Sequence, residues 1–263
     1  MNSYLTRVLL CVGAAFVIAL IFAVVPAQAQ ILRKDGILPA LLNLDRGYEP
    51  FGLSSGAAPE GPIWVRWQEF EAGVTQNTEA LARCRADTAT CTPAETRLLA
   101  VIDNVRNVQG RAKFGLINRA INLSIVYTSD RLQHAVGDVW SSALETFSAG
   151  QGDCEDFAIA KYVALREAGV AAQDLRLLVG RIPAIGQAHA VVAARLDGRW
   201  LILDNRRMAM VEDIHASELQ PMFALDDSGV RQFGTPAMTI STAVSGRPEV
   251  SVPVAGGALP VLM

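Results

Sequence analysis

A short hairpin signal constrains the fold of this chain most tightly. Asp197-Gly198 separates two runs of strand-like residues, 189–196 and 200–204, and this dipeptide favours a two-residue type I′ turn. Such a turn fixes the register of the two strands, along which side chains alternate between the faces. His189 and Asp204 are therefore predicted to lie on one face as diagonal neighbours, with Cα atoms about 7–8 Å apart and side chains able to meet. The register predicts a carboxylate that orients an imidazole.

A cysteine stands at the predicted start of a helix. Asp153 has the side chain of a helix N-cap, and Cys154 follows it as the first helical residue. Apolar residues recur at helical spacing over 157–168, and Gly169 stands where a helix end favours positive φ. The free backbone N–H groups of a helix start favour a thiolate, so the position suits a nucleophile. The alternative is a buried cysteine that only packs within a core helix.

Together these residues have the pattern of a Cys-His-Asp triad. Taken alone, His189 is more often a hydrogen-bonded core histidine, and Asp204 can belong to a turn at a strand end. In combination they predict nucleophilic catalysis by Cys154, His189 and Asp204. The other two histidines fit this role less well, because His134 lies in a polar segment and His215 at the start of a short exposed helix.

The first 29 residues are predicted to be a signal peptide rather than part of the fold. A single charge, Arg7, precedes an apolar run over 8–25, and Ala27-Gln28-Ala29 matches a cleavage site. The alternative is a retained membrane anchor, since about 20 apolar residues span a bilayer. Both alternatives take the chain out of the cytoplasm, and cleavage predicts a periplasmic protein.

Export bears on the pairing of the four cysteines. Cys11 leaves with the signal peptide, and Cys84 and Cys91 are close enough in sequence to form a local disulfide in an oxidising compartment. A metal site at this pair is the alternative, but neither a histidine nor a further cysteine lies nearby. Cys154 then remains as an unpaired thiol, which in an exported protein indicates reactivity.

The rest of the chain is long enough for one domain with a substantial core. We expect an irregular lead-in over 30–60, a compact domain over 61–234 and a flexible tail over 235–263. The 263 residues carry a formal net charge of −3, and no segment concentrates positive charge, which argues against nucleic acid as a partner.

Several elements of the domain are predicted from local signals. Thr92-Pro93-Ala94-Glu95 is a capping box that predicts a helix as far as Val108. A second helix is predicted over 113–123, with Leu116 among its inward residues. Residues 175–180 have the pattern of a further strand.

Three short motifs around the predicted triad resemble a known family. Residues 152–158 read Gly-Asp-Cys-Glu-Asp-Phe-Ala, residues 187–191 read Gln-Ala-His-Ala-Val, and residues 203–205 read Leu-Asp-Asn. They are similar to the motifs of the bacterial transglutaminase-like cysteine proteinases, a family that includes the LapG-like periplasmic proteases. The resemblance covers residues 61–234. One departure, Phe157 in place of the usual tyrosine, does not touch the triad.

The resemblance implies a fold and an activity. The fold is a papain-like, transglutaminase-type α+β core, in which the nucleophile begins a helix packed on an antiparallel sheet that carries the other two residues. The activity is proteolysis, with Cys154 attacking a peptide carbonyl, His189 moving the proton and Asp204 orienting His189. The alternatives are acyl transfer to an amine and a non-catalytic calcium-dependent binding module.

The resemblance also implies a metal and partners. LapG-like members depend on calcium bound by acidic residues beside the cysteine, which here are Asp153 and Glu155, with Asp156 as a further candidate. The alternative for these acids is structural, because carboxylates in the first turn of a helix stabilise its dipole. The expected partners are a cell-surface adhesin as the protein substrate and an inner-membrane regulatory receptor.

Overall fold

One helix, α8 (Cys154–Glu167), lies at the centre of the structure. Every residue from Glu155 to Leu165 is buried, so the helix has neighbours around its whole circumference. It begins at Cys154 with Asp153 as its N-cap, as predicted, and Gly169 follows its end with a φ of 87°. The first residue of the helix, Cys154, which is the predicted nucleophile, therefore lies at the edge of the core.

The computed structural model describes residues 49–135 and 137–234. The predicted signal peptide, the predicted tail and residues 30–48 of the predicted lead-in lie outside these ranges. No helix in the described ranges is long and apolar enough to span a membrane.

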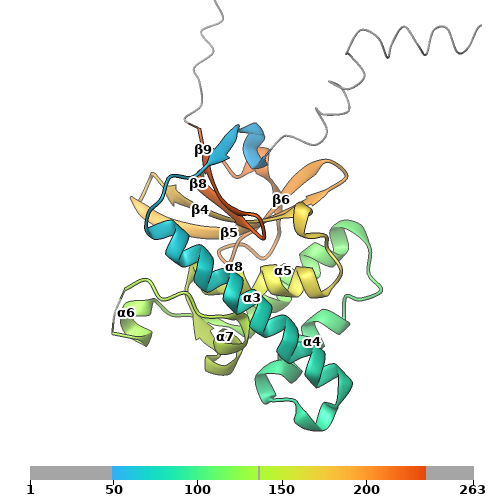
Figure 1. Ribbon diagram of the computed structural model, residues 1–263. Coiled ribbons are helices and arrows are strands. Elements are labelled where there is room, and N and C mark those ends of the chain that lie inside the picture. Colours follow the sequence, from blue (N-terminus) through green and yellow to red (C-terminus); the bar gives the residue numbers. More distant parts are fainter. Residues whose placement is uncertain (1–48, 136, 235–263) are drawn as a thin grey trace, which may run out of the picture.

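Helices surround α8 on the side away from the sheet (Figure 1). They are α3 (Pro62–Ala86), α4 (Pro93–Asp103), α5 (Gly110–Ser124), the short α6 (Asp130–Gln133) and α7 (Ala143–Ala149). All but α6 make extensive contacts with α8. The described ranges also contain four 3-10 turns: η1 (Pro50–Gly52), η2 (Thr88–Thr90), η3 (Ala172–Asp174) and η4 (Asp213–His215).

The helices differ in part from the predicted ones. The capping box at Thr92 and Glu95 is present, but α4 ends at Asp103 and not at Val108. In α5 the prediction for Leu116 is wrong: its side chain is 46% exposed, because the buried stripe runs through Phe114, Ile117 and Ile121 instead. The long helix α3 was not predicted.

A seven-stranded antiparallel sheet packs against α8 through its central strands. The sheet has the order β1-β9-β8-β4-β5-β6-β7. Its strands are β1 (Ser55–Ala57), β4 (Leu175–Ile182), β5 (Gln187–Leu196), β6 (Arg199–Leu203), β7 (Val211–Glu212), β8 (Gln220–Asp226) and β9 (Gly229–Phe233). Residues 55–57 of the predicted lead-in thus belong to the edge of the sheet. A small parallel pair, β2 (Val126–Tyr127) and β3 (Gln151–Gly152), precedes α8. The predicted α+β class is confirmed.

The hairpin between β5 and β6 has the predicted register. Leu196 pairs with Arg199, and the pairing continues in step to Val192 with Leu203. Asp197 and Gly198 both have positive φ, 49° and 77°, as a type I′ turn requires.

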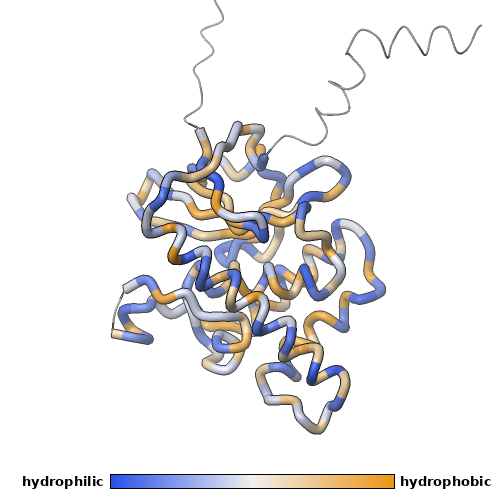
Figure 2. The backbone as a smooth tube through the Cα atoms, in the orientation of Figure 1, coloured by the Kyte–Doolittle hydropathy of each residue, from blue (hydrophilic) through white to orange (hydrophobic). Residues whose placement is uncertain are grey.

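The sheet has apolar residues on both faces. The inner face, with residues such as Val192 and Leu203, packs on α8 and the other helices and forms the main core. The outer face, with Val191 and Trp200, forms a second, smaller cluster. Figure 2 shows hydrophobic residues along the central strands and the helices beneath them. A slip of the hairpin by one residue would exchange the side chains that pack in these two clusters.

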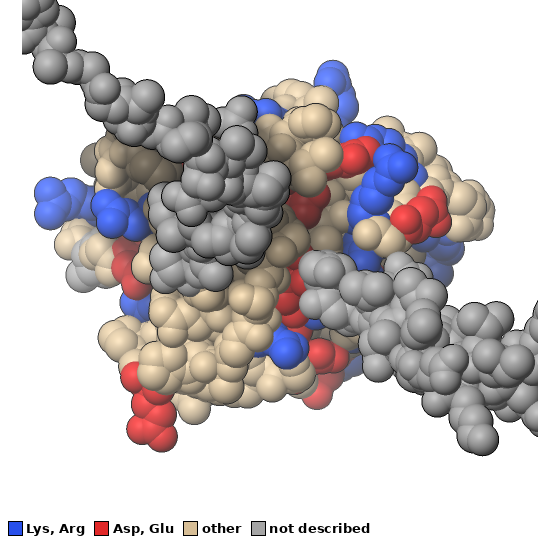
Figure 3. All heavy atoms as spheres, turned by 90° about the horizontal axis from the view of Figure 1, so that it is seen from above, with Lys and Arg blue, Asp and Glu red and all other residues tan. Residues whose placement is uncertain are grey.

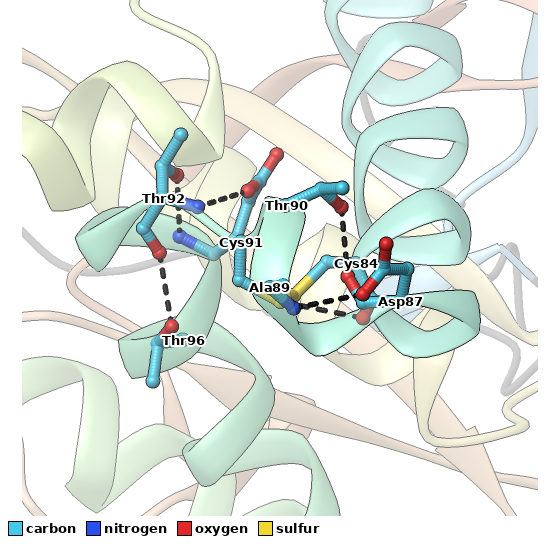
Figure 4. The surroundings of a disulfide bond; sticks show 8 residues. Cys84, Asp87, Ala89, Thr90, Cys91, Thr92 and Thr96 are labelled. Carbon is cyan, nitrogen blue, oxygen red and sulfur yellow. Dashed lines mark hydrogen bonds between the residues drawn. A yellow bond between two sulfur atoms is a disulfide. The ribbon is translucent and has the colours of Figure 1, made fainter.

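A disulfide joins the end of α3 to the start of α4. Cys84 and Cys91 are bonded, with Cα atoms 4.7 Å apart, and Figure 4 shows the pair beside η2 and the Thr92 cap. The predicted pairing is confirmed, and Cys154 is a free cysteine.

Basic and acidic side chains occur side by side on the face seen in Figure 3. This mixed distribution agrees with the small formal net charge of −3.

Candidate active site

The start of α8 fixes Cys154 through a buried carboxylate. Asp156 accepts hydrogen bonds from the backbone N–H groups of Asp153, at 3.2 Å, and Ser141, at 2.8 Å. It thereby caps the helix and ties it to the loop before α7. A Cβ on Gly152 would lie 2.6 Å from an Asp156 oxygen, so glycine is required for the carboxylate to fold back over the turn. The thiol of Cys154 is half-buried, with Sγ 3.0 Å from Glu155 Oε2.

The hairpin brings His189 and Asp204 together as the register predicted. His189 Nε2 lies 2.9 Å from Asp204 Oδ1, and both residues are buried. A charged carboxylate only accepts hydrogen bonds, so Nε2 carries the proton and Nδ1 is the free acceptor. The same Oδ1 accepts the backbone N–H of Arg206 at 2.9 Å, and the Asp204 carbonyl accepts from Asn122 Nδ2 at 3.0 Å. These bonds hold the carboxylate in place.

Cys154 and His189 line the same cleft. One part of it, with a volume of about 510 Å³, is also lined by Tyr127, Phe157 and Arg206. The other part, about 320 Å³, runs past Trp140 and the two acids that flank the cysteine. A peptide chain lying in the cleft would pass both the thiol and the imidazole.

The thiol is held in its neutral form by its surroundings. Burial raises the pKa of Cys154 well above its usual value, and the charge of Glu155, which accepts the S–H hydrogen bond, raises it further. Asp153 acts in the same direction, and only a hydrogen bond from the Ala190 backbone opposes them. Burial and the two adjacent acids thus oppose the helix start, whose backbone N–H groups favour a thiolate.

The acids predicted as metal ligands belong to a larger cluster. Asp153, Cys154 and Glu155 offer ligand atoms within 4.8 Å of one another, and so do Asp130, Asp153 and Asp156. Asp130, at the start of α6, was not predicted: it lies in a polar segment, 23 residues before Asp153. The parallel pair β2–β3 brings that segment to the start of α8.

The cluster has buried oxygen atoms without partners. Among the described residues, Asp130 Oδ1 and Asp153 Oδ1 are buried and accept no hydrogen bond. Burial raises the pKa of Asp153, raises that of Glu155 to about 8 and raises that of Asp156 to about 7. Carboxylates that cannot be ionised together at neutral pH, with free oxygens converging on one point, fit a divalent cation.

Comparison with known proteins places these residues in a family. The model of the bacterial transglutaminase-like cysteine proteinases (BTLCP) matches residues 74–219, a range that contains the whole candidate site. No curated protein matches the chain.

The solved structures that match include LapG of Legionella pneumophila. It is 24% identical over 59% of this chain and 87% of that chain, with a TM-score of 0.50. An EGTA-treated form of the same protein is 24% identical over 60% of this chain and 86% of that chain, with a TM-score of 0.51. A calcium-bound form is 23% identical over 64% and 93%, with a TM-score of 0.49. The first two matches show a shared fold, so the predicted papain-like, transglutaminase-type core is confirmed.

The raised pKa values of the acids predict how the metal-stripped protein responds to pH. Folded Glu155 and Asp156 keep their protons up to about pH 8 and 7, whereas the unfolded chain releases them near 4.5 and 3.8. The folded state therefore binds more protons between these limits, and its stability falls as the pH rises through them. We expect the melting temperature in EGTA to be lower at pH 8 than at pH 5. Glu155→Gln should flatten this fall, while Glu79→Gln, an exposed control on α3, should not. A melting temperature that rises from pH 5 to pH 8 would contradict these assignments.

Proposed function

The chain belongs to the bacterial transglutaminase-like cysteine proteinases, and on this premise we propose that it is an exported, periplasmic cysteine endopeptidase. Its catalytic residues are Cys154, His189 and Asp204. The observation that carries the proposal is the buried 2.9 Å contact between His189 Nε2 and Asp204 Oδ1, beside a cleft that the free thiol of Cys154 also lines.

Each of the three residues has a role in the proposed mechanism. Asp204 accepts a hydrogen bond from Nε2–H of His189, which leaves Nδ1 free to take the proton of the Cys154 thiol. The thiolate attacks a peptide carbonyl and forms a thioester. The imidazolium returns the proton to the departing amine, and water, deprotonated by His189, releases the acid and regenerates the thiol. The backbone N–H of Cys154, free at the helix start, is the natural donor to the oxyanion.

Calcium belongs to the proposal as a structural cofactor. Asp130, Asp153 and Glu155 would hold the ion, with backbone carbonyls or water completing the six to eight oxygens that calcium takes. Asp156 is less suited, since its oxygens already accept from two backbone N–H groups. The ion would supply positive charge that neutralises the acids beside the thiol.

The family resemblance extends the proposal to partners. A cell-surface adhesin is the proposed substrate, and an inner-membrane receptor is the proposed regulator. Both would meet the enzyme in the periplasm, where the predicted signal peptide delivers it.

Loss of the thiol should abolish the release of a surface protein. We expect cells with Cys154→Ala or His189→Ala to retain an envelope protein that wild-type cells shed as a fragment, because both variants lack a member of the triad. His215→Ala, which removes an exposed histidine of η4, is the matched control and should shed normally. Mass spectrometry of the culture medium and of the envelope compares the strains. Unchanged shedding in Cys154→Ala, or purified protein that cleaves no envelope protein, would refute the protease assignment.

Calcium should bind the metal-stripped protein and stabilise it. Calorimetry should show one site, and calcium at a hundredfold excess over Kd should stabilise the fold by about 2.7 kcal/mol. Magnesium should bind poorly, because it prefers a small octahedral site that retains water. Asp130→Asn and Asp153→Asn should each weaken binding, and Asp103→Asn, an exposed residue at the end of α4, should not. If calcium at millimolar concentration does not bind, the acids are structural. The protease proposal would survive, because it rests on the triad.

A further inference from the structure

A lysine is buried in the core on the helix that carries Cys154. Lys161 lies on α8, about two turns beyond Cys154, with no exposed surface. Among the described residues, its Nζ has no hydrogen-bond partner. The ring of Phe157, one turn earlier, has its centroid 5.8 Å from Nζ and gives only partial compensation. An apolar side chain of similar size would fill this space without the penalty of desolvating an ammonium.

The charge that acts on Lys161 is that of Asp204. Burial lowers the pKa of Lys161 to about 7, and the carboxylate of Asp204 opposes that fall. Burial would raise the pKa of Asp204, but it is held below its usual value by its hydrogen bonds to His189 and Arg206 and by the charge of Lys161. The two buried ions thus favour each other's charged form.

The neighbouring helix α5 contributes amide side chains to the surroundings of Asp204. Asn122 of α5 donates to the Asp204 carbonyl, and both Asn118 and Asn122 donate to the Arg207 carbonyl. The Oδ1 atoms of both amides are buried without a partner in the described ranges, like the ammonium. The remaining ionisable groups near the pair are His189, bonded to Asp204, Arg206, which donates its backbone N–H to Asp204 and lines the cleft, and Cys154 at the start of α8. No carboxylate other than Asp204 acts on Lys161.

A second lysine shows what a structural role looks like in this fold. Lys113 of α5 is partly exposed and donates from Nζ to the carbonyl of Ala168, 2.8 Å away, at the end of α8. It satisfies a helix terminus and keeps its ammonium near water. Lys161 does neither, so packing and capping do not explain a lysine at this position.

We propose that Lys161 is a positioning residue of the active site, whose buried ammonium keeps Asp204 ionised and so preserves its hydrogen bond with His189 as the pH falls. The inference rests on the proposed catalytic role of these two residues, but the contact it concerns does not depend on any substrate. Without the ammonium, the buried carboxylate would take up a proton at a higher pH, because removing a nearby positive charge disfavours the carboxylate. The histidine would then lose the acceptor that fixes its tautomer.

The test follows the hydrogen bond itself. The chain has three histidines, so histidine-selective NMR can resolve the Nε2–H proton of His189, which lies at low field when bonded to a carboxylate. In calcium-loaded protein, we expect the acid midpoint for loss of this signal to move upward by about 0.5 pH unit or more in Lys161→Met. Lys161→Gln, which keeps a donor without the charge, should show the same shift. Lys161→Arg should stay close to wild type, and Lys113→Met is the matched control that should not shift.

The outcomes separate charge from packing. If Lys161→Met melts at a lower temperature but keeps the wild-type midpoint, Lys161 only fills space and the proposal is overturned. If the neutral variants do not fold, lysine-selective ¹⁵N NMR of the wild type decides: an ammonium across the acidic midpoint supports the proposal, and a neutral amine there overturns it. Failure of the protease assignment would appear separately, as intact envelope proteins, with the His189 signal unchanged.

Discussion

The arrangement of the site depends on the packing of α8 against β4 and β5. The helix is buried along almost its whole length, so its axis cannot move without disturbing helices on one side and the sheet on the other. Its first residue is Cys154, and the strand it packs on carries His189. Two residues 35 positions apart therefore meet at one cleft because the core fixes the elements that bear them. The geometry of the candidate site is a consequence of core packing and not of local loop structure.

The site also depends on the balance of buried charges around the thiol and the imidazole. The thiol has two acidic side chains beside it, and the imidazole has one. Among the described residues, the buried ammonium of Lys161, on which Asp204 acts, has no hydrogen-bond partner. Within the apolar core these charges interact more strongly than they would in water. At the thiol, the proposed calcium ion would compensate the acids that oppose ionisation. At the imidazole, Lys161 is the proposed compensation for Asp204. Both the thiol and the imidazole thus have a buried acidic side chain beside them whose charge requires compensation.

The sequence predicted the features that depend on short-range rules. The backbone geometry of the Asp197-Gly198 turn sets the register of the hairpin. The side chains of Thr92 and Asp153 are typical of helix N-caps, so they predict where two helices begin. The sequence could not predict Asp130, because only the pairing of β2 with β3 brings it to Asp153. The helix α3 was also not predicted, because many polar residues interrupt its apolar pattern. The burial of Lys161 was not predicted either, because a helical pattern alone would place a lysine at the surface. The wrong expectation for Leu116 arose in the same way, since the buried stripe of α5 includes Asn118 and Asn122, side chains that an apolar pattern does not reveal.

The rate at which iodoacetamide alkylates Cys154 tests the central claim most directly, because only the thiolate reacts. At pH 7 we expect metal-stripped protein to react at least about tenfold more slowly than calcium-loaded protein, since each unit of thiol pKa changes the thiolate fraction about tenfold. At pH 9 in EGTA, where the Glu155 carboxyl of the wild type is ionised and opposes the thiolate, Glu155→Gln should react faster than wild type. Equal rates with and without calcium, in wild type and in Glu155→Gln, would contradict the claim that these acids govern the nucleophile.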